Sequence, residues 1–178
     1  MADHASPIWT YRVLFVILVS IIVFVQLLPL NPGPGGIPGP DVILLIALSW
    51  IVMRPDYVPV LLLAGVIFAT DLLLMRPPGL WTALAILSGE FLRARQAQLR
   101  AASFLSEWAL VAGLVAAMTI TNALVLAVFA VDQPSLGLTI MRLVFTIICY
   151  PLVVILCGRA FGIRKIKAGE QDRFGQRI

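Results

Sequence analysis

The chain has 178 residues, of which 61% are hydrophobic and 12% charged, with a mean hydropathy of +1.01 and a formal net charge of +4. An average soluble domain carries about 25% charged residues, so this chain lacks the polar surface that a soluble protein needs. The composition therefore excludes a soluble globular protein and predicts one integral membrane domain over residues 1–178.

The positive charge is concentrated near the end of the chain, at Arg159, Arg164, Lys165 and Lys167. Beside a membrane such a cluster indicates the cytoplasmic face and anionic lipid, and we expect no nucleic-acid partner. His4 is the only histidine, so no metal site can be built around it. Cys149 and Cys157 are predicted to be small buried hydrophobic residues. We expect neither a metal nor another cofactor.

The first apolar run covers residues 13–30 and is long enough to cross a bilayer. A cleaved signal peptide is the competing interpretation, but its apolar region would be shorter and would end in small residues. We therefore expect a retained first span. Residues 31–40 are nearly all Gly and Pro, which excludes a helix and predicts a connecting loop.

Short and longer apolar runs then alternate. Asp41 is placed to cap a helix over residues 41–53, and that helix of about 20 Å is shorter than a hydrocarbon core of about 30 Å. Trp50, near its end, fits the aromatic belt at a membrane interface. Residues 57–75 predict a longer helix, and residues 79–92 predict a second short one.

The second half of the chain contains a polar segment over residues 93–106, whose three arginines mark it as cytoplasmic. Residues 107–131 and 139–161 are two further full-length apolar runs, and a basic cytoplasmic tail over residues 162–178 follows. We predict an all-α polytopic membrane protein with six transmembrane helices, two of them short.

The distribution of Lys and Arg predicts the orientation. In a six-span arrangement the cytoplasmic side holds Arg12, Arg54, the arginines of residues 93–106 and all basic residues from Arg159 onward, and the outer side holds Arg76 and Arg142. This asymmetry predicts that both termini are cytoplasmic. It leaves four or six spans open, because re-entrant short runs would exchange only Arg54 and Arg76.

One carboxylate, Asp71, lies inside the run over residues 57–75. An ionisable group within a span is a candidate functional site, because its burial in lipid is unfavourable unless it is paired or hydrated. In the six-span arrangement Asp71 lies in the outer leaflet at a depth similar to Arg142. We predict an Asp71–Arg142 ion pair that joins the third and sixth spans. The alternative is an Asp71 that bonds to backbone or Ser/Thr groups.

The corner directly after Asp71 determines how two spans meet. The candidate structural or interaction residues are therefore Asp71, Arg142, Pro77, Pro78, Gly79, Asn122 and Trp50. Glu90 lies three residues before Arg93, which predicts a local ion pair rather than a proton relay with Asp71. Neither H-E-x-x-H nor G-x-S-x-G occurs, and no second carboxylate is placed with Asp71. The sequence therefore predicts a protein that is not an enzyme and has no catalytic residues.

Short motifs are spread over the chain: Pro40-Asp41 opens a run that ends in Trp50 and Arg54-Pro55, Gly65 precedes Asp71-Leu72-Leu73, Pro77 and Gly79 follow, and Pro151 lies in the last span. On these residues the chain resembles the rod shape-determining protein MreD family, small bacterial inner-membrane proteins of about this size and hydropathy. It departs from the family at Leu74-Met75-Arg76, where many relatives carry small residues such as Ser and Gly.

This resemblance implies a non-enzymatic, multispan scaffold subunit of the cell-elongation machinery in the bacterial inner membrane. It implies partners: MreC, the actin-like MreB filament, a RodA-type glycosyltransferase and a penicillin-binding transpeptidase that build lateral peptidoglycan. It also implies a six-helix fold similar to the substrate-binding subunits of energy-coupling-factor transporters. The alternative is a small-solute binding or transport subunit that uses Asp71 in an intramembrane cavity, with Thr119 and Asn122 as further polar groups.

Overall fold

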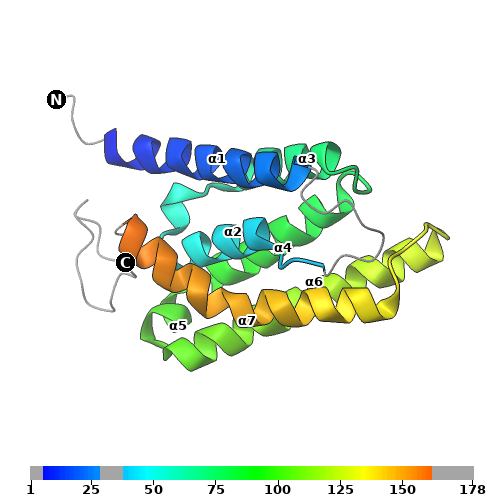
Figure 1. Cartoon of the computed structure of the whole chain (residues 1–178). Helices are drawn as coiled ribbons and strands as arrows, with labels where there is room; N and C mark the ends of the chain where they lie inside the picture. Colours follow the sequence, from blue (N-terminus) through cyan, green and yellow to red (C-terminus); the bar gives the residue numbers. More distant parts are fainter. Residues whose placement is uncertain (1–5, 29–37, 162–178) are drawn as a thin grey trace.

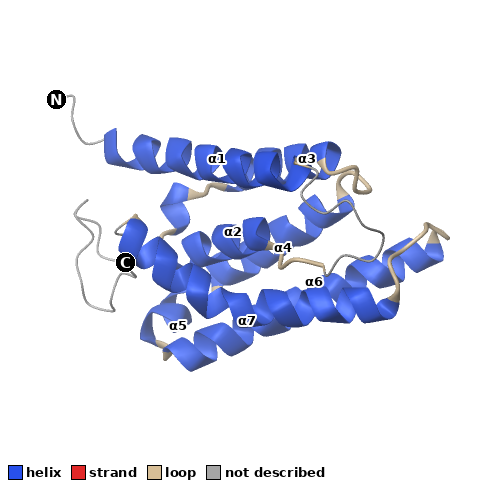
Figure 2. Ribbon diagram, viewed as in Figure 1, coloured by secondary structure: helices blue, strands red, loops and turns tan. Residues whose placement is uncertain are grey.

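A computed structural model of the chain describes residues 6–28 and 38–161, and regular structure in these residues is entirely helical (Figures 1 and 2). The elements are α1 (Ser6–Leu27), α2 (Val42–Met53), the 3-10 helix η1 (Pro55–Tyr57), α3 (Val60–Leu73), α4 (Leu80–Ala94), α5 (Gln96–Ala101), α6 (Phe104–Val128) and α7 (Leu136–Ala160). His4 and the predicted tail over residues 162–178 lie outside the described residues.

Three of these helices, α1, α6 and α7, contain stretches long and apolar enough to cross a membrane: Ile8–Leu27, Phe104–Val128 and Leu136–Ala160. Helices α2 and α3 are apolar but shorter. The protein is therefore a membrane-embedded helical protein. Many of the apolar side chains on the outside of α1, α6 and α7 are exposed, as expected for helices that face lipid.

The main helices run alternately in opposite directions between two ends of the bundle (Figure 1). At the first end, the Tyr11 end, the hydroxyl of Tyr11 donates to the carbonyl of Phe161 at 3.3 Å, and Arg12 donates to the carbonyl of Asp56 at 3.2 Å. The opposite end, the Asp41 end, contains Asp41 and the corner between α3 and α4. The two ends therefore carry different sets of charged groups.

Helix α2 is the core of the bundle. All of its residues from Ile43 to Met53 are buried, and it packs against α1, α4 and α7 (Figure 1). A helix that is apolar on every side is stable only when protein surrounds it. Its sequence limits are the predicted ones: the Asp41 side chain accepts from the N–H of Leu44, and the helix ends at Met53 before Arg54 and Pro55.

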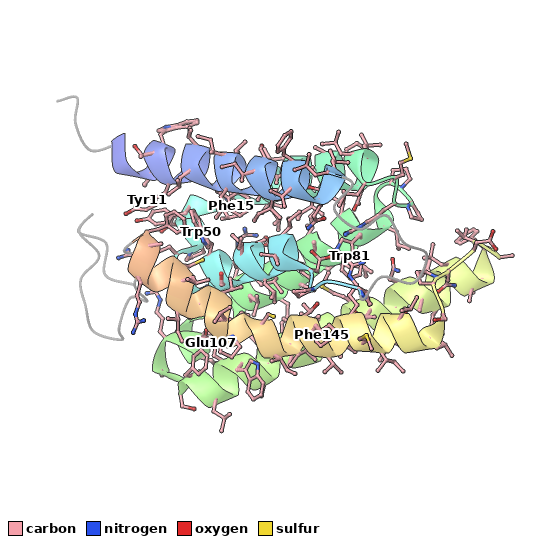
Figure 3. All side chains as sticks on the ribbon, in the orientation of Figure 1. Tyr11, Phe15, Trp50, Trp81, Glu107 and Phe145 are labelled. Atoms are coloured by element: carbon pink, nitrogen blue, oxygen red, sulfur yellow. The ribbon has the colours of Figure 1, made fainter. Side chains whose placement is uncertain are left out.

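An aromatic cluster closes the Tyr11 end around Trp50 (Figure 3). The ring centroid of Trp50 lies 5.5 to 6.5 Å from the rings of Tyr11, Phe15, Tyr57 and Phe161. Trp50 is fully buried, and its indole N–H donates to Sγ of Cys157 at 3.3 Å. The prediction that Trp50 belongs to an interfacial belt is wrong, because α1 and α7 cover its helix.

One further expectation about the helices needs correction. The predicted helix over residues 57–75 is shorter, because Pro59 precedes α3 and a 3-10 turn at Pro55–Tyr57 takes up the residues before it. The polar segment over residues 93–106 is largely helical, since α4 continues to Ala94 and α5 follows. Its amide group at Gln96 donates to the carbonyl of Ile51 at 2.7 Å, which ties this segment to the end of α2.

Helix α4 approaches α2 and α3 closely at Gly89. A Cβ atom at this glycine would lie 3.1 Å from both Cδ1 of Ile51 and Cδ2 of Leu63. The missing side chain thus allows three helices to meet in the core, and any larger residue would push these side chains away.

Candidate functional site

The site begins at Asp41, the N-cap of α2. Its Oδ1 accepts from the N–H of Leu44 at 3.2 Å, and its own N–H donates to the hydroxyl of Thr146 in α7 at 3.0 Å. The Thr146 hydroxyl in turn donates to the carbonyl of Arg142 at 2.7 Å. These bonds join the start of the central helix to the last helix, although the residues lie more than a hundred positions apart in the chain.

The other oxygen of Asp41 binds two arginines. Oδ2 lies 2.8 Å from Nη2 of Arg142 and 3.3 Å from Nη1 of Arg76. We call Asp41, Arg76 and Arg142 the arginine cluster. The Asp41 side chain is 6% exposed, whereas those of Arg76 and Arg142 are 22% and 39% exposed. A carboxylate this deeply buried requires compensation, and the two guanidinium groups supply it.

This geometry contradicts the predicted Asp71–Arg142 pair. Within residues 6–28 and 38–161, the ion-pair partner of Arg142 is Asp41 and not Asp71. The reason is that similar depth along two helices does not bring their side chains onto facing sides. Asp41 lies at the same end of the bundle as Arg142, and it also faces Arg142 because it begins the helix that α7 packs against.

The backbone after α3 turns sharply enough to bring Arg76 to Asp41. The N–H of Arg76 donates to the carbonyl of Asp71 at 2.9 Å, and that of Met75 donates to Leu72 at 3.3 Å. This pair of bonds is a Schellman motif, in which the residue after the helix adopts a left-handed conformation. Met75 does so with φ of 52°, although glycine is favoured there. Pro77 and Pro78 then follow on the surface.

Asp71 is also fully buried, but it binds a helix terminus instead of a cation. Its Oδ2 accepts from the hydroxyl of Thr82 at 2.7 Å and from the backbone N–H of Thr82 at 3.2 Å. The N-cap residue of α4 is Gly79, whose φ is 91° and which has no side chain to cap the helix. Asp71 supplies that missing acceptor from the preceding helix, and its charge is favourable at a helix N-terminus.

The alternative prediction for Asp71, a bond to backbone or Ser/Thr groups, is therefore confirmed. Its second oxygen, Oδ1, is buried and has no hydrogen-bond partner among the described residues. Gly79 acts together with Asp71, because its left-handed conformation starts α4 at the position where the carboxylate reaches Thr82.

Two further acidic side chains are paired. The predicted Glu90–Arg93 ion pair is confirmed, and Arg93 also donates to the carbonyl of Val58. Glu107, which the sequence did not single out, is buried in α6 and accepts from the hydroxyl of Tyr150 in α7 at 3.0 Å. Figure 3 places Glu107 between these two helices.

A cavity of about 390 Å³ lies beside the arginine cluster. Its walls come from the start of α2, the corner before α4, and the facing parts of α6 and α7; they include Arg76, Arg142, Trp81, Asn122 and Leu126. Asn122 and Thr119 therefore lie on one cavity, as the transport alternative requires, but Asp71 is not among the lining residues.

The arginine cluster and the cavity beside it bring together charged and polar groups that can bind a ligand. In the part of the chain that the structure describes, no three His, Cys, Asp or Glu side chains are grouped so that they could hold a metal ion. No family model, curated protein or solved structure matches the chain. What the protein does is therefore inferred from its residues and their arrangement.

Proposed function

We propose that this protein is a non-enzymatic scaffold subunit of the bacterial cell-elongation machinery, of the MreD type. It spans the inner membrane six times with both termini in the cytoplasm. It positions MreC, and with it MreB, a RodA-type glycosyltransferase and a penicillin-binding transpeptidase, for lateral peptidoglycan synthesis. The sequence motifs given above are the basis for proposing this family, and the geometry supports a binding role.

One observation carries this proposal: each buried carboxylate among the described residues joins two helices. Asp41 joins α2 to α7, Asp71 joins α3 to α4, and Glu107 joins α6 to α7. A transporter or enzyme places its intramembrane acids on a water-filled path or substrate site. Here Asp71 and Glu107 lie outside the cavity lining, and Asp41, which does line the cavity, is paired with two arginines. These acids therefore stabilise a fixed arrangement of helices, which is what a positioning subunit needs.

The arrangement of arginines supports six crossings. Asp56, which follows Arg54, accepts a bond from Arg12 at the Tyr11 end, whereas Arg76 and Arg142 meet at the Asp41 end. Four crossings with re-entrant short helices would require Arg54 and Arg76 to exchange sides. Helices α2, α3 and α4 are short for a bilayer. Helix α2 is buried among other helices and need not match the lipid thickness, whereas α3 and α4 expose apolar side chains such as Leu61 and Leu87 on their outer sides.

A groove between α1 and α3 is the proposed seat of an apolar helix of MreC. It encloses about 350 Å³ and is lined by Val16, Val23 and Phe24 of α1 and by Gly65 and Ala69 of α3. A Cβ at Gly65 would meet nothing within 4 Å, so another backbone has room to approach. Small residues that allow close approach are the usual contact points between helices in membranes.

The alternative, a small-solute binding or transport subunit, is favoured by the cavity beside the arginine cluster. Several polar groups converge there, including Thr119, Asn122 and Arg142. The form of this alternative that uses Asp71 as the ligand group loses support, because Asp71 binds Thr82 and lies outside the cavity lining.

Depletion of the protein in its own host, followed by microscopy and purification of bound proteins, tests the proposal. We expect rounded cells, and co-purification of MreC with the tagged wild-type chain. Normal cell shape with loss of uptake of one nutrient would establish the transport alternative instead.

Substitutions in the groove sharpen this test. Gly65→Leu with Ala69→Leu fills the groove and is expected to abolish co-purification of MreC and rescue of cell shape. Gly113→Leu with Ala117→Leu is the matched control, because both residues are exposed on α6 away from the groove. Helical content and thermal melting of the purified variants show whether they fold. Equal MreC binding by the two double variants would contradict the proposed seat.

A further inference from the structure

The arginine cluster has more positive charge than its carboxylate neutralises. Two guanidinium groups share one oxygen of Asp41, so the three side chains together carry one excess positive charge. Each guanidinium has five N–H donors, and among the described residues the hydrogen bonds of each guanidinium go to Asp41. Arg76 and Arg142 therefore keep donors for a second anion, on the side where they line the cavity.

The remaining cavity wall is mainly apolar. Leu44, Trp81, Val115, Leu126 and Leu143 surround the space beside the two arginines. A small inorganic anion would leave this surface uncovered, whereas an anion attached to an apolar body would cover it. The volume of about 390 Å³ is at the small end of the range for ligand sites, roughly 300 to 1,000 Å³, so it cannot hold two lipid chains.

A lipid's chains have a surface to follow outside the cavity. At the Asp41 end, α6 and α7 expose Leu124, Val128 and Ile140, with 62%, 81% and 58% of each residue accessible. In a membrane-embedded protein these residues face hydrocarbon. A headgroup in the cavity and acyl chains along this surface would satisfy both the charge and the apolar area.

Besides Asp41, a second acidic residue, Asp132, lines the cavity and opposes an anion. It lies in the connection between α6 and α7 and is exposed. Water and salt screen an exposed charge, whereas the partly buried arginines act at close range. The arginines therefore determine the charge of the ligand.

We propose that this cavity binds the headgroup of an acidic phospholipid, with its phosphate oxygens held by Arg76 and Arg142. Guanidinium groups bind phosphate through paired N–H bonds, and two of them match the spread of oxygens on a phosphodiester. This binding is independent of the partners proposed above. It adds a lipid requirement to the Asp41 end of the bundle.

The test measures lipid retention by native mass spectrometry and melting temperature in detergent, with phosphatidylglycerol or phosphatidylcholine added to the full chain. Phosphatidylglycerol is expected to remain bound and to raise the melting temperature, and phosphatidylcholine is not. Equal effects of the two lipids would contradict a charge-selective site. Free glycerol phosphate is the soluble arm, and equal stabilisation by it would overturn the lipid assignment in favour of a soluble organic phosphate.

Two variants locate the binding in the cavity. Arg142→Met is expected to weaken phosphatidylglycerol binding roughly tenfold, the loss of one charge-assisted contact. Ala123→Phe blocks the cavity with both arginines in place and is expected to abolish binding. The matched controls are Arg159→Met and Ala117→Phe, exposed residues outside the cavity, which should bind as the wild type does. Unchanged binding by Ala123→Phe, folded as judged by its lipid-free melting, would overturn the proposal.

Discussion

Asp41 and Asp71 are chemically identical, similarly buried, and both cap a helix, yet their surroundings differ. Asp41 caps its own helix and has two arginines on its second oxygen. Asp71 caps a helix that begins nine residues later and is bonded to Thr82, with no arginine among its partners in the described residues. A membrane protein can therefore stabilise a buried carboxylate either by neutralising it or by placing it on backbone and hydroxyl donors at a positive helix end.

The difference also separates local from distant structure. The cap at Asp41 needs only the next three residues, but its ion pairs need α3 and α7 to be in place. The cap at Asp71 needs only the corner that includes Pro77, Pro78 and Gly79, because this corner turns the chain back and brings Thr82 to Asp71. Substitutions at the two aspartates should therefore differ in size and in which helices they loosen.

The largest effect is expected for Asp41→Ala. It leaves two guanidinium groups without their carboxylate and removes the cap of α2, so we expect a loss of about 3 to 5 kcal/mol in the free energy of unfolding. Asp41→Asn keeps a capping side chain, and it should lose about 1 kcal/mol less. Unfolding by a mixed-micelle SDS titration, followed by tryptophan fluorescence, measures both. Equal losses in the two variants would show that the cap contributes nothing.

Asp71→Ala is expected to cost less, about 2 kcal/mol, because no cation is left unpaired. Thr82→Val removes only the hydroxyl bond and should cost roughly half as much. In a double-mutant cycle the two changes should be less than additive, since both remove the same contact. Strict additivity in the same SDS titration would mean that the Asp71–Thr82 contact does not form in the membrane.

Single substitutions of the arginines are expected to be smaller again. Arg76→Met or Arg142→Met leaves Asp41 with one guanidinium, so each should cost about 1 kcal/mol. The double variant leaves the carboxylate buried without a cation and should cost more than the sum. The double-mutant cycle is the measurement, and a simple sum would show that the two arginines contribute independently of each other.

The last effect is no larger and has the opposite sign: a gain in stability at the corner between α3 and α4. Met75 has a positive φ and an exposed side chain, so Met75→Gly should raise the free energy of unfolding by about 1 kcal/mol. Ala130→Gly is the matched control, because Ala130 occupies the same position of a second Schellman motif after α6. A gain at Ala130 with a loss at Met75 would indicate that the methionine side chain makes a contact in the assembled protein.

Features that depend on neighbouring residues could be predicted from the sequence. The limits of α2 follow from Asp41 and from Arg54-Pro55, and the Glu90–Arg93 pair follows from helical spacing. Long apolar runs predicted α1, α6 and α7 as membrane helices, although the first begins at Ser6 rather than residue 13.

Features that depend on how helices face one another could not be predicted from the sequence. Similar depth in the membrane suggested Asp71 as the partner of Arg142. The rotation of each helix about its axis decides which carboxylate the arginine meets, however, and that rotation arises from the packing of the whole bundle. Asp41 could have been considered, because the six-span arrangement places it at the same end as both arginines. Trp50 was misplaced for a similar reason, since its sequence position does not reveal that α1 and α7 cover it.

The complete burial of α2 has a consequence for biosynthesis. This helix emerges second from the ribosome, but α7, which it packs against and which supplies Thr146 and Arg142, emerges last. Asp41 therefore lacks these partners, in the translocon or among lipids, until nearly the whole chain has been made. Quality-control proteases that recognise unshielded membrane charges can use this interval, so chains that end before α7 should be degraded rather than accumulate.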